Sequence, residues 1–246
     1  MASLQQVLDV DHPELGSYIR VLSVIFPSTD DTVHQGLDRI LWRCTQVIEL
    51  TVGCDVTHAV CVDWDPELPK DTRLALESLI QSPTCKSLLS YGFRFPISIF
   101  LDPQRTCGIQ SLAFSKRGVV SIRGFVDQAN DLPVQGLPYT ALRSLSARPA
   151  LIQAFLSACF QDGQNLFDFT NLDTLWVDHT SWRSTQTHLT LQMMDRAPSL
   201  RTLGLELDCE CPTSVLSNSG LLFSQLKLTM WSGIFSRVRR RASPRP

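Results

Sequence analysis

The amino-acid sequence predicts an α/β fold in which a curved parallel sheet is built from short strands joined by helical and irregular crossovers. Three observations lead to this prediction. A six-residue apolar phrase recurs along the chain, polar residues fill most of its remaining positions, and amphipathic segments stand in several of the intervals. This spacing is typical of a leucine-rich-repeat-like solenoid, in which each unit buries its apolar residues against its neighbours.

The two clearest copies of the phrase lie at residues 172–177 and 200–205. Both carry leucine at positions one and four and an aliphatic residue at position six, and they start 28 residues apart. Alternate side chains of a strand point to the same face, so positions four and six share one face and positions three, five and seven share the other. We therefore expect a short strand at each copy, with its leucine side buried.

Other copies start at residues 19, 47, 85, 109, 142 and 223, and the copy at 85 is degraded. Intervals between successive starts vary from 23 to 38 residues, which fits repeats that carry insertions. We expect parallel strands centred near residues 22, 50, 88, 112, 145, 175, 203 and 226. The predicted core is a ladder of position-four leucines: Leu22, Leu50, Leu112, Leu145, Leu175 and Leu203.

Several intervals carry helical signals. A helix capped by Asp30 or Asp31 would place Val33, Leu37, Ile40 and Leu41 on one face, and a second, opened by Asp71, would bury Leu74, Leu79 and Ile80. Pro149 suits the first position of a third, whose apolar residues run from Leu151 to Phe160. Residues 95–100 fit one helical turn or an extended bridge, 119–123 resemble an extra strand, and 55–70 and 131–138 read as insertions.

The domain organisation follows from these elements. Residues 1–16 read as an N-terminal cap segment, 17–232 as the leucine-rich-repeat-like domain, and 233–246 as a disordered basic tail. The net charge of −2 gives no case for a nucleic-acid partner, and no apolar run is long enough for a membrane partner. Because the N-terminus lacks a signal-peptide pattern, we expect a cytoplasmic protein; the basic run 237–241 would also fit nuclear localisation.

The sequence lacks the usual signs of reaction chemistry. No nucleophile motif or glycine-rich phosphate loop occurs, and Asp178–His179, the strongest acid–base candidate, has no partner nucleophile. The eight cysteines are mostly single and at apolar positions, and only Cys209 and Cys211 form a close pair. We therefore expect reduced thiols, no metal site, no cofactor and no enzymatic activity.

The remaining candidate is a surface on the outward side of the strands. Its rows are mostly serine, threonine, alanine and glycine, and larger groups gather toward the C-terminal half. The predicted partner-binding residues are Trp176, Asp178, Arg143, Arg148, Arg201 and Glu206. Tryptophan is enriched at binding hot spots, so Trp176 would be the anchor. The alternative is that a loop or Trp182 covers Trp176.

Four segments resemble the leucine-rich C-terminal region of fungal, mushroom-type F-box proteins. They are Tyr18–Val24, Phe95–Leu101, Gly108–Leu112 and Phe169–Trp176, within a resemblance that covers roughly residues 15–210. It implies a module that holds the protein substrate of a ubiquitin ligase. The residues before Tyr18 do not match the Leu-Pro-x-Glu start of an F-box, so we expect substrate recognition to carry over and docking on a Skp1-type adaptor not to.

A second function remains open beside this one. The same surface would serve a free-standing leucine-rich scaffold, or a truncated paralogue, with no role in a ubiquitin ligase. Both functions need a protein-binding face and no catalytic residue, so the repeated phrase does not separate them.

Overall fold

The large parallel sheet is the centre of the fold. The structure is a computed structural model that describes residues 12–27, 36–55, 62–64, 68–100, 107–114, 119–121, 140–158, 165, 167–179, 184–207 and 227–232. Eight parallel strands form this sheet in chain order: β1 (Val21–Pro27), β2 (Glu49–Asp55), β4 (Ser87–Tyr91), β6 (Ser111–Phe114), β9 (Ser144–Ala147), β11 (Thr174–His179), β12 (Thr202–Leu207) and β13 (Lys227–Ser232). Each strand therefore lies beside the strand of this sheet that comes next along the chain.

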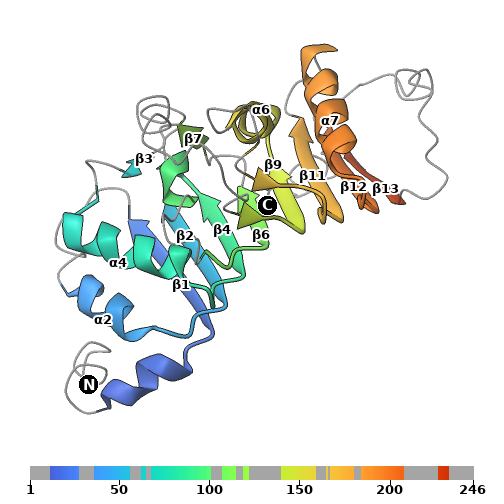
Figure 1. Ribbon diagram of the computed structural model, residues 1–246. Coiled ribbons are helices and arrows are strands. Elements are labelled where there is room, and N and C mark those ends of the chain that lie inside the picture. Colours follow the sequence, from blue (N-terminus) through green and yellow to red (C-terminus); the bar gives the residue numbers. More distant parts are fainter. Residues whose placement is uncertain are drawn as a thin grey trace, which may run out of the picture.

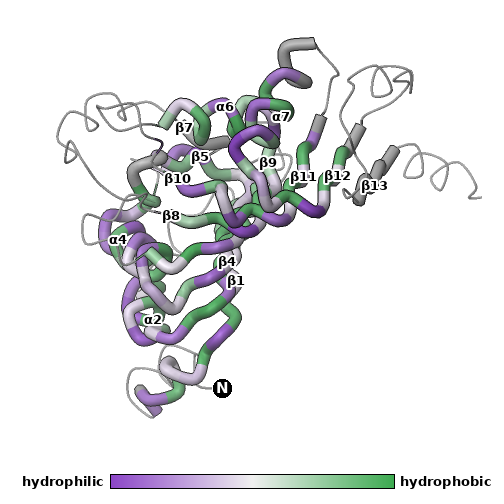
Figure 2. Tube along the Cα trace, turned by 45° about the vertical axis from the view of Figure 1, so that its right-hand side comes forward, coloured by the Kyte–Doolittle hydropathy of each residue, from purple (hydrophilic) through white to green (hydrophobic). Residues whose placement is uncertain are grey.

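The register of this sheet aligns the repeated phrase. Leu22 pairs with Leu50, and the ladder continues through Leu88, Leu112, Leu145, Leu175 and Leu203. From Leu50 to Leu203 these side chains are buried, and Figure 2 shows apolar and polar residues alternating along the strands. The predicted strands near residues 22 to 203, and their parallel pairing, are confirmed.

Two parts of the ladder differ from the prediction. Leu203 pairs with Leu228, so β13 is shifted by two residues from the strand expected around Leu226. Leu22 is only partly buried, because among the described residues β1 is the first strand of the sheet and has a neighbour on one side alone. Position six of the degraded copy is Ser90, which is fully buried among apolar residues.

The described residues contain four α-helices: α2 (Leu37–Arg43), α4 (Lys70–Gln81), α6 (Pro149–Ser157) and α7 (Ser184–Arg196). Figures 1 and 2 show them along one side of the large sheet. Helix α6 begins at Pro149 as expected, and it buries Leu151, Ile152, Phe155 and Leu156. In α4, Leu79 and Ile80 are buried but Leu74 is exposed, because Ala75 and Leu76 occupy the inward side of that turn.

Shorter elements complete the turns between the strands. The 3-10 helix η2 (Pro13–Tyr18) precedes β1, and η4 (Ile97–Phe100) follows β5. The strands β3 (Val62–Asp63), β5 (Phe93–Pro96) and β7 (Val119–Ser121) form a parallel three-stranded sheet, and β8 (Thr140–Ala141) pairs with β10 (Phe167–Asp168). Residues 95–100 are thus both extended and helical, and the extra strand predicted at 119 is present.

A chain of aromatic contacts runs through the interior between the large sheet and its coverings. Successive ring centroids lie 4.4–6.4 Å apart. We call these residues the aromatic spine: Phe26, Trp64, Phe93, Phe95, Phe100, Phe114, Phe155, Phe167 and Phe169. The spine connects β1 to the loop before β11, so it joins turns that are distant in the sequence.

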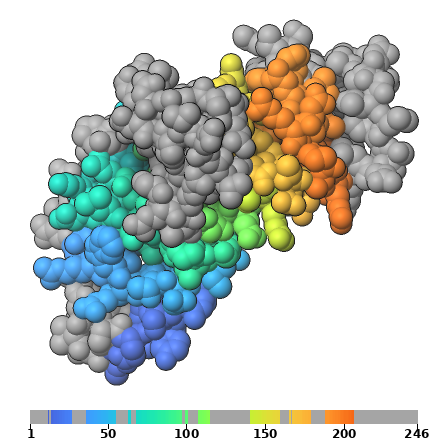
Figure 3. Space-filling view, viewed as in Figure 1, coloured from blue at the N-terminus to red at the C-terminus, as the bar shows by residue number. Residues whose placement is uncertain are grey.

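The parts of the chain follow one another in space as they do in the sequence. Figure 3 shows the coloured residues passing from the N-terminal strands at one end of an elongated molecule to α7 and β12 toward the other. Long-range pairing is therefore mostly between consecutive turns. Residues 1–11 of the predicted N-terminal cap segment 1–16, the loop 131–138 and the basic tail 233–246 lie outside the described residues, and the rest of the cap segment leads into η2.

Candidate functional site

The candidate site is the outward face of the large sheet, opposite the leucine ladder. Positions three, five and seven of each copy lie on this face, and most of their side chains are partly exposed. Its middle is formed mostly by small side chains, Ser87, Ser111, Ala113, Ser144 and Ser146, beside the exposed Leu89 of β4, which pairs with Ala113. The small groups leave the backbone of β6 and β9 accessible to a bound molecule.

Trp176 is the largest side chain next to this small-residue region. It lies in β11 between Ser146 of β9 and Gly204 of β12, and it is half-buried. A Cβ atom built on Gly204 would come within 2.1–2.5 Å of the indole ring, so the ring lies directly over that glycine. Gly204 is needed there for close approach. Trp182, the residue considered as a cover, lies outside the described residues.

An ion pair follows Trp176 on the same face. Arg148 Nε lies 3.5 Å from Asp178 Oδ2, and the two side chains are 33% and 13% exposed. Arg148 comes directly after β9, whose Ala147 pairs with Val177, so the register brings the two charges together. A pair held at this depth loses part of its hydration and is less screened by salt than an exposed pair. It therefore gives the Trp176 surface a fixed polar border.

The predicted site residues divide into two groups. Trp176, Arg148 and Asp178 lie together, and Glu206 pairs in register with Asp178, although its side chain is not among those described. Arg143 and Arg201 are exposed at the opposite ends of their strands, before β9 and β12. Arg143 precedes Arg148 by five residues, about 16 Å of extended chain. The six residues therefore do not form one compact patch.

A second aromatic ring on this face was not predicted from the sequence. Tyr91 of β4 lies over Gly53 of β2, where an added Cβ would meet ring atoms at 2.0–2.4 Å. The same kind of contact, an aromatic ring lying over a glycine of the neighbouring strand, thus occurs at Tyr91 and Gly53 in the N-terminal half and at Trp176 and Gly204 in the C-terminal half. The usable signal in the sequence is an aromatic residue and a glycine at equivalent positions of consecutive copies. The small-residue region thus lies between two ring-covered glycines.

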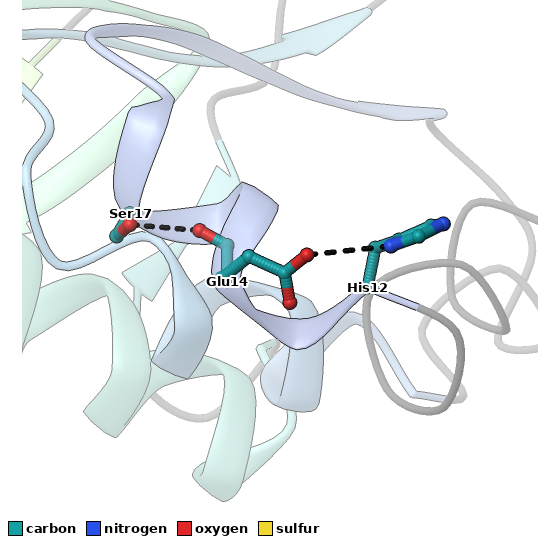
Figure 4. Close-up of polar contacts among 3 residues, drawn as sticks. All are labelled: His12, Glu14 and Ser17. Atoms are coloured by element: carbon teal, nitrogen blue, oxygen red, sulfur yellow. Dashed lines mark hydrogen bonds and ion pairs between the residues drawn. The ribbon is translucent and has the colours of Figure 1, made fainter.

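The two histidines whose side chains are described, His12 and His188, form no acid–base pair with a nucleophile, and the side chain of His179 is not among those described. His12 Nδ1 lies 3.3 Å from Glu14 Oε1, and Ser17 Oγ donates a hydrogen bond to the Glu14 carbonyl at 2.7 Å, as Figure 4 shows. All three groups lie in or beside η2 at the surface, where such pairs contribute little to stability. His188 is exposed on α7. Within the described part of the chain, no cluster of histidine, cysteine and carboxylate groups could hold a metal ion.

A cleft of about 620 Å³ lies between α2 and α4, away from the outward face of the sheet. Its lining is mostly apolar and includes the half-exposed side chains of Trp42 and Leu74. The one carboxylate in the lining belongs to Glu77, which accepts a hydrogen bond from Trp64 Nε1 at 2.9 Å. The charged group of this cleft is therefore already used to position the buried indole.

Four cysteines lie among the described residues, all as free thiols: Cys44, Cys54, Cys85 and Cys107. Burial raises the pKa of the Cys44 thiol. Burial, with a smaller contribution from the neighbouring Cys107, raises the pKa of Cys85 to about 12. Because the thiolate is the reactive form, these two buried groups are poor nucleophiles at neutral pH.

Alkylation tests the state of the thiols. In the folded protein at pH 8, Cys44 and Cys85 will react with iodoacetamide much more slowly than the half-buried Cys107, because their raised pKa values keep them protonated. In urea without reductant, all eight cysteines of the chain will react. Mass spectrometry of the labelled peptides gives both results. Rapid native labelling of Cys85, or two or more cysteines left unlabelled in urea, would contradict this expectation.

Comparison of the chain with protein-family models gives no match, and comparison with curated proteins gives none. Over the described residues, no helix has the length and apolar character needed to cross a membrane. The assignment of a function therefore depends on the geometry of the outward face.

Proposed function

We propose that the chain is a leucine-rich-repeat-like solenoid that binds another protein through the outward face around Trp176. The observation that carries this proposal is the placement of a half-buried tryptophan over Gly204, bordered by the Arg148–Asp178 pair and by small side chains. Binding hot spots commonly combine an aromatic anchor held in a defined position with polar groups around it. A partner would bury the remaining exposed part of the indole.

The solenoid part of the proposal is supported by the sheet register. One copy of the phrase contributes one strand, consecutive copies pair in parallel, and their position-four leucines align. In such an architecture each turn packs mainly on its two neighbours, and one strand per turn contributes to a continuous binding surface. The extra residues of the longer intervals are then insertions on the side of the sheet that carries the helices.

The resemblance to F-box proteins suggests the class of partner. A substrate-recognition region would hold a protein destined for ubiquitin transfer, whereas a free-standing scaffold would bind its partner with no ligase attached. Co-purification of the chain from cells separates these two functions. A Skp1-type adaptor retained in stoichiometric amount supports the ligase role, and its absence from complexes that contain a partner supports the scaffold.

Trp176→Ala tests the binding face. We expect the substitution to weaken binding of the partner by about 2 kcal/mol or more, because it removes the anchor. It should lower the free energy of unfolding by about 1 kcal/mol or less, since Trp176 is half-buried and its main contact on the neighbouring strand is a glycine. Binding of the partner is measured first by quantitative capture from cell extract. It is then measured by titration calorimetry with the purified partner.

Tyr91→Ala is the matched control. It removes a ring that covers a glycine in the same way, but in the N-terminal half of the sheet. A partner that binds through Trp176 will be retained by Tyr91→Ala and lost by Trp176→Ala. If both variants keep the partner, or both lose it only because they unfold, the site around Trp176 is wrong.

A further inference from the structure

A row of basic side chains lies along one edge of the large sheet, where the strands begin. The row is formed by position two of the repeated phrase, the residue directly before a strand. Arg20, Lys86, Arg143 and Arg201 hold this position before β1, β4, β9 and β12, and all four are exposed. We call these four residues the basic row.

Backbone hydrogen bonds align the members of the row. The N–H groups of Ile48 and Glu49 both donate to the carbonyl of Arg20, at 2.7 and 3.0 Å. The same double contact repeats between each pair of consecutive copies, so that position two of one copy accepts from positions two and three of the next. The full set of aligned residues is Arg20, Ile48, Lys86, Gln110, Arg143, Asp173 and Arg201.

The cations recur on every second strand. In the sheet order β1-β2-β4-β6-β9-β11-β12, the basic residues precede the first, third, fifth and seventh strands. Adjacent strands lie about 4.8 Å apart, so neighbouring cations are separated by about 10 Å along the edge. The residues between them are Ile48, Gln110 and Asp173. The edge is thus locally basic in a chain whose net charge is −2.

These charges are not neutralised by carboxylates within the described structure. The guanidinium of Arg20 donates to the carbonyls of Ser17 and Gln46, at 2.6 and 3.3 Å. The ammonium of Lys86 donates to the carbonyl of Pro83 at 2.6 Å. Among the ion pairs formed by the described residues, none includes a member of the basic row. Neutral carbonyls hold two of the side chains in place and leave their positive charge to act on a partner.

We propose that the basic row binds an extended acidic segment of the partner protein, which crosses the strands and carries a carboxylate at every third residue. A polyproline II chain has three residues per turn and advances about 3.1 Å per residue, so every third side chain lies on the same side of the segment, at intervals of about 9.3 Å that match the separation of two cations. The inference rests on the proposed protein-binding function and adds the chemistry of the partner. The aligned positions hold no aromatic side chain on which a nucleic-acid base could stack, which favours a peptide over a single strand.

A labelled peptide built from Glu-Pro-Ser repeats is the direct probe. Fluorescence anisotropy at low salt will show that it binds the full-length chain, and more tightly than a peptide of the same composition whose glutamates are contiguous. The triple variant Lys86→Glu, Arg143→Glu, Arg201→Glu will bind the repeat peptide about tenfold or more weakly, because each exposed ion pair contributes a factor of about 1.4–5. Arg20 is left unchanged because its side chain holds the Ser17 and Gln46 carbonyls.

The matched control places the same charge change on the helices. Arg39→Glu, Arg43→Glu, Lys70→Glu alters three exposed side chains on α2 and α4. It should keep repeat-peptide binding within about threefold. An equal loss of repeat-peptide binding in the two triple variants would show that binding depends on net charge alone and not on the basic row. That result would overturn the proposal. Tighter binding of a single-stranded oligonucleotide of equal charge would overturn it as well.

Asp173→Asn gives a result that misfolding cannot imitate. Asp173 is the one acidic residue among the aligned positions, between Arg143 and Arg201, and its side chain is exposed. Removing its charge should strengthen binding of the repeat peptide about twofold or more. Unchanged or weaker binding would count against the row as the peptide site. If no acidic peptide binds while Trp176→Ala still abolishes partner binding, the basic-row proposal is wrong and the proposed function stands.

Discussion

Replacing Leu145 with alanine will lower the free energy of unfolding by about 2–5 kcal/mol. Leu145 is fully buried in β9 and pairs with Leu112 on one side and Leu175 on the other. Truncation removes apolar contacts in the middle of the ladder and leaves a cavity that strands fixed by pairing on both sides cannot close. Urea unfolding followed by circular dichroism measures the loss.

Leu22→Ala is the matched control for this prediction. Leu22 holds the same position of the phrase, but it is only partly buried and its strand pairs with β2 alone. The loss should be less than half of that at Leu145, because less apolar surface leaves water there on folding. Equal losses at the two positions would contradict a ladder whose stability depends on neighbours on both sides.

The second large effect is expected at Phe155. Its ring contacts three others of the aromatic spine, with centroid distances of 6.3 Å to Phe100, 6.2 Å to Phe114 and 4.7 Å to Phe167. These partners belong to η4, β6 and β10, so α6 is attached through Phe155 to three separate elements. We expect Phe155→Ala to cost about 3–5 kcal/mol and to reduce the near-ultraviolet circular dichroism signal.

Two further variants separate packing from a general effect on α6. Phe155→Leu keeps most of the apolar volume and loses the ring contacts, so its cost should lie well below that of alanine. Gln153→Ala changes an exposed residue on the same helix and should leave stability within about 0.5 kcal/mol of the wild type. A Phe155→Leu variant as stable as the wild type would show that the spine contributes nothing beyond its apolar volume.

The strands could be predicted because their determinants are local and repeated. One leucine per copy marks the centre of each strand, and parallel pairing of consecutive copies aligns these leucines from Leu22 to Leu203. The prediction was wrong by two residues at β13, where Leu228 and Met230 offer the same apolar alternation as Leu226 and Leu228. Period-two patterns allow such a shift without exchanging the two faces.

The aromatic spine could not be predicted in the same way. Its rings come from several kinds of position: Phe93 and Phe95 lie in a strand of four residues, and Phe155 lies on a helix. Their contacts join elements distant in sequence, and periodicity carries no information about such pairs. The burial of Trp64 and Phe167 could not be predicted either. Trp64 directly follows a strand of two residues and Phe167 lies in another, and such strands are too short to show an alternation of apolar and polar residues.

For the site, the sequence indicated the face but not the grouping of its residues. Strand alternation placed Trp176 and Asp178 outward, and register then brought Arg148 to Asp178. Arg143 and Arg201 were assigned to the same patch because they belong to the same copies of the phrase as the outward residues. They precede their strands, however, and so lie at the opposite end of the face from Arg148 and Asp178. The rings over Gly53 and Gly204 depend on side-chain direction across strands, for which the sequence offers only an aromatic residue and a glycine at equivalent positions of consecutive copies.

Site-specific photo-crosslinking tests the central claim, that a protein partner binds the outward face near Trp176. A benzophenone amino acid would replace Thr202, which lies on that face in β12, or Gln153, which is exposed on α6 on the side of the helices. We expect covalent complexes with the partner from position 202, their loss when Trp176→Ala is added, and none from position 153. Crosslinks from position 153 alone, or equal yields from both positions, would contradict the assignment of the binding face.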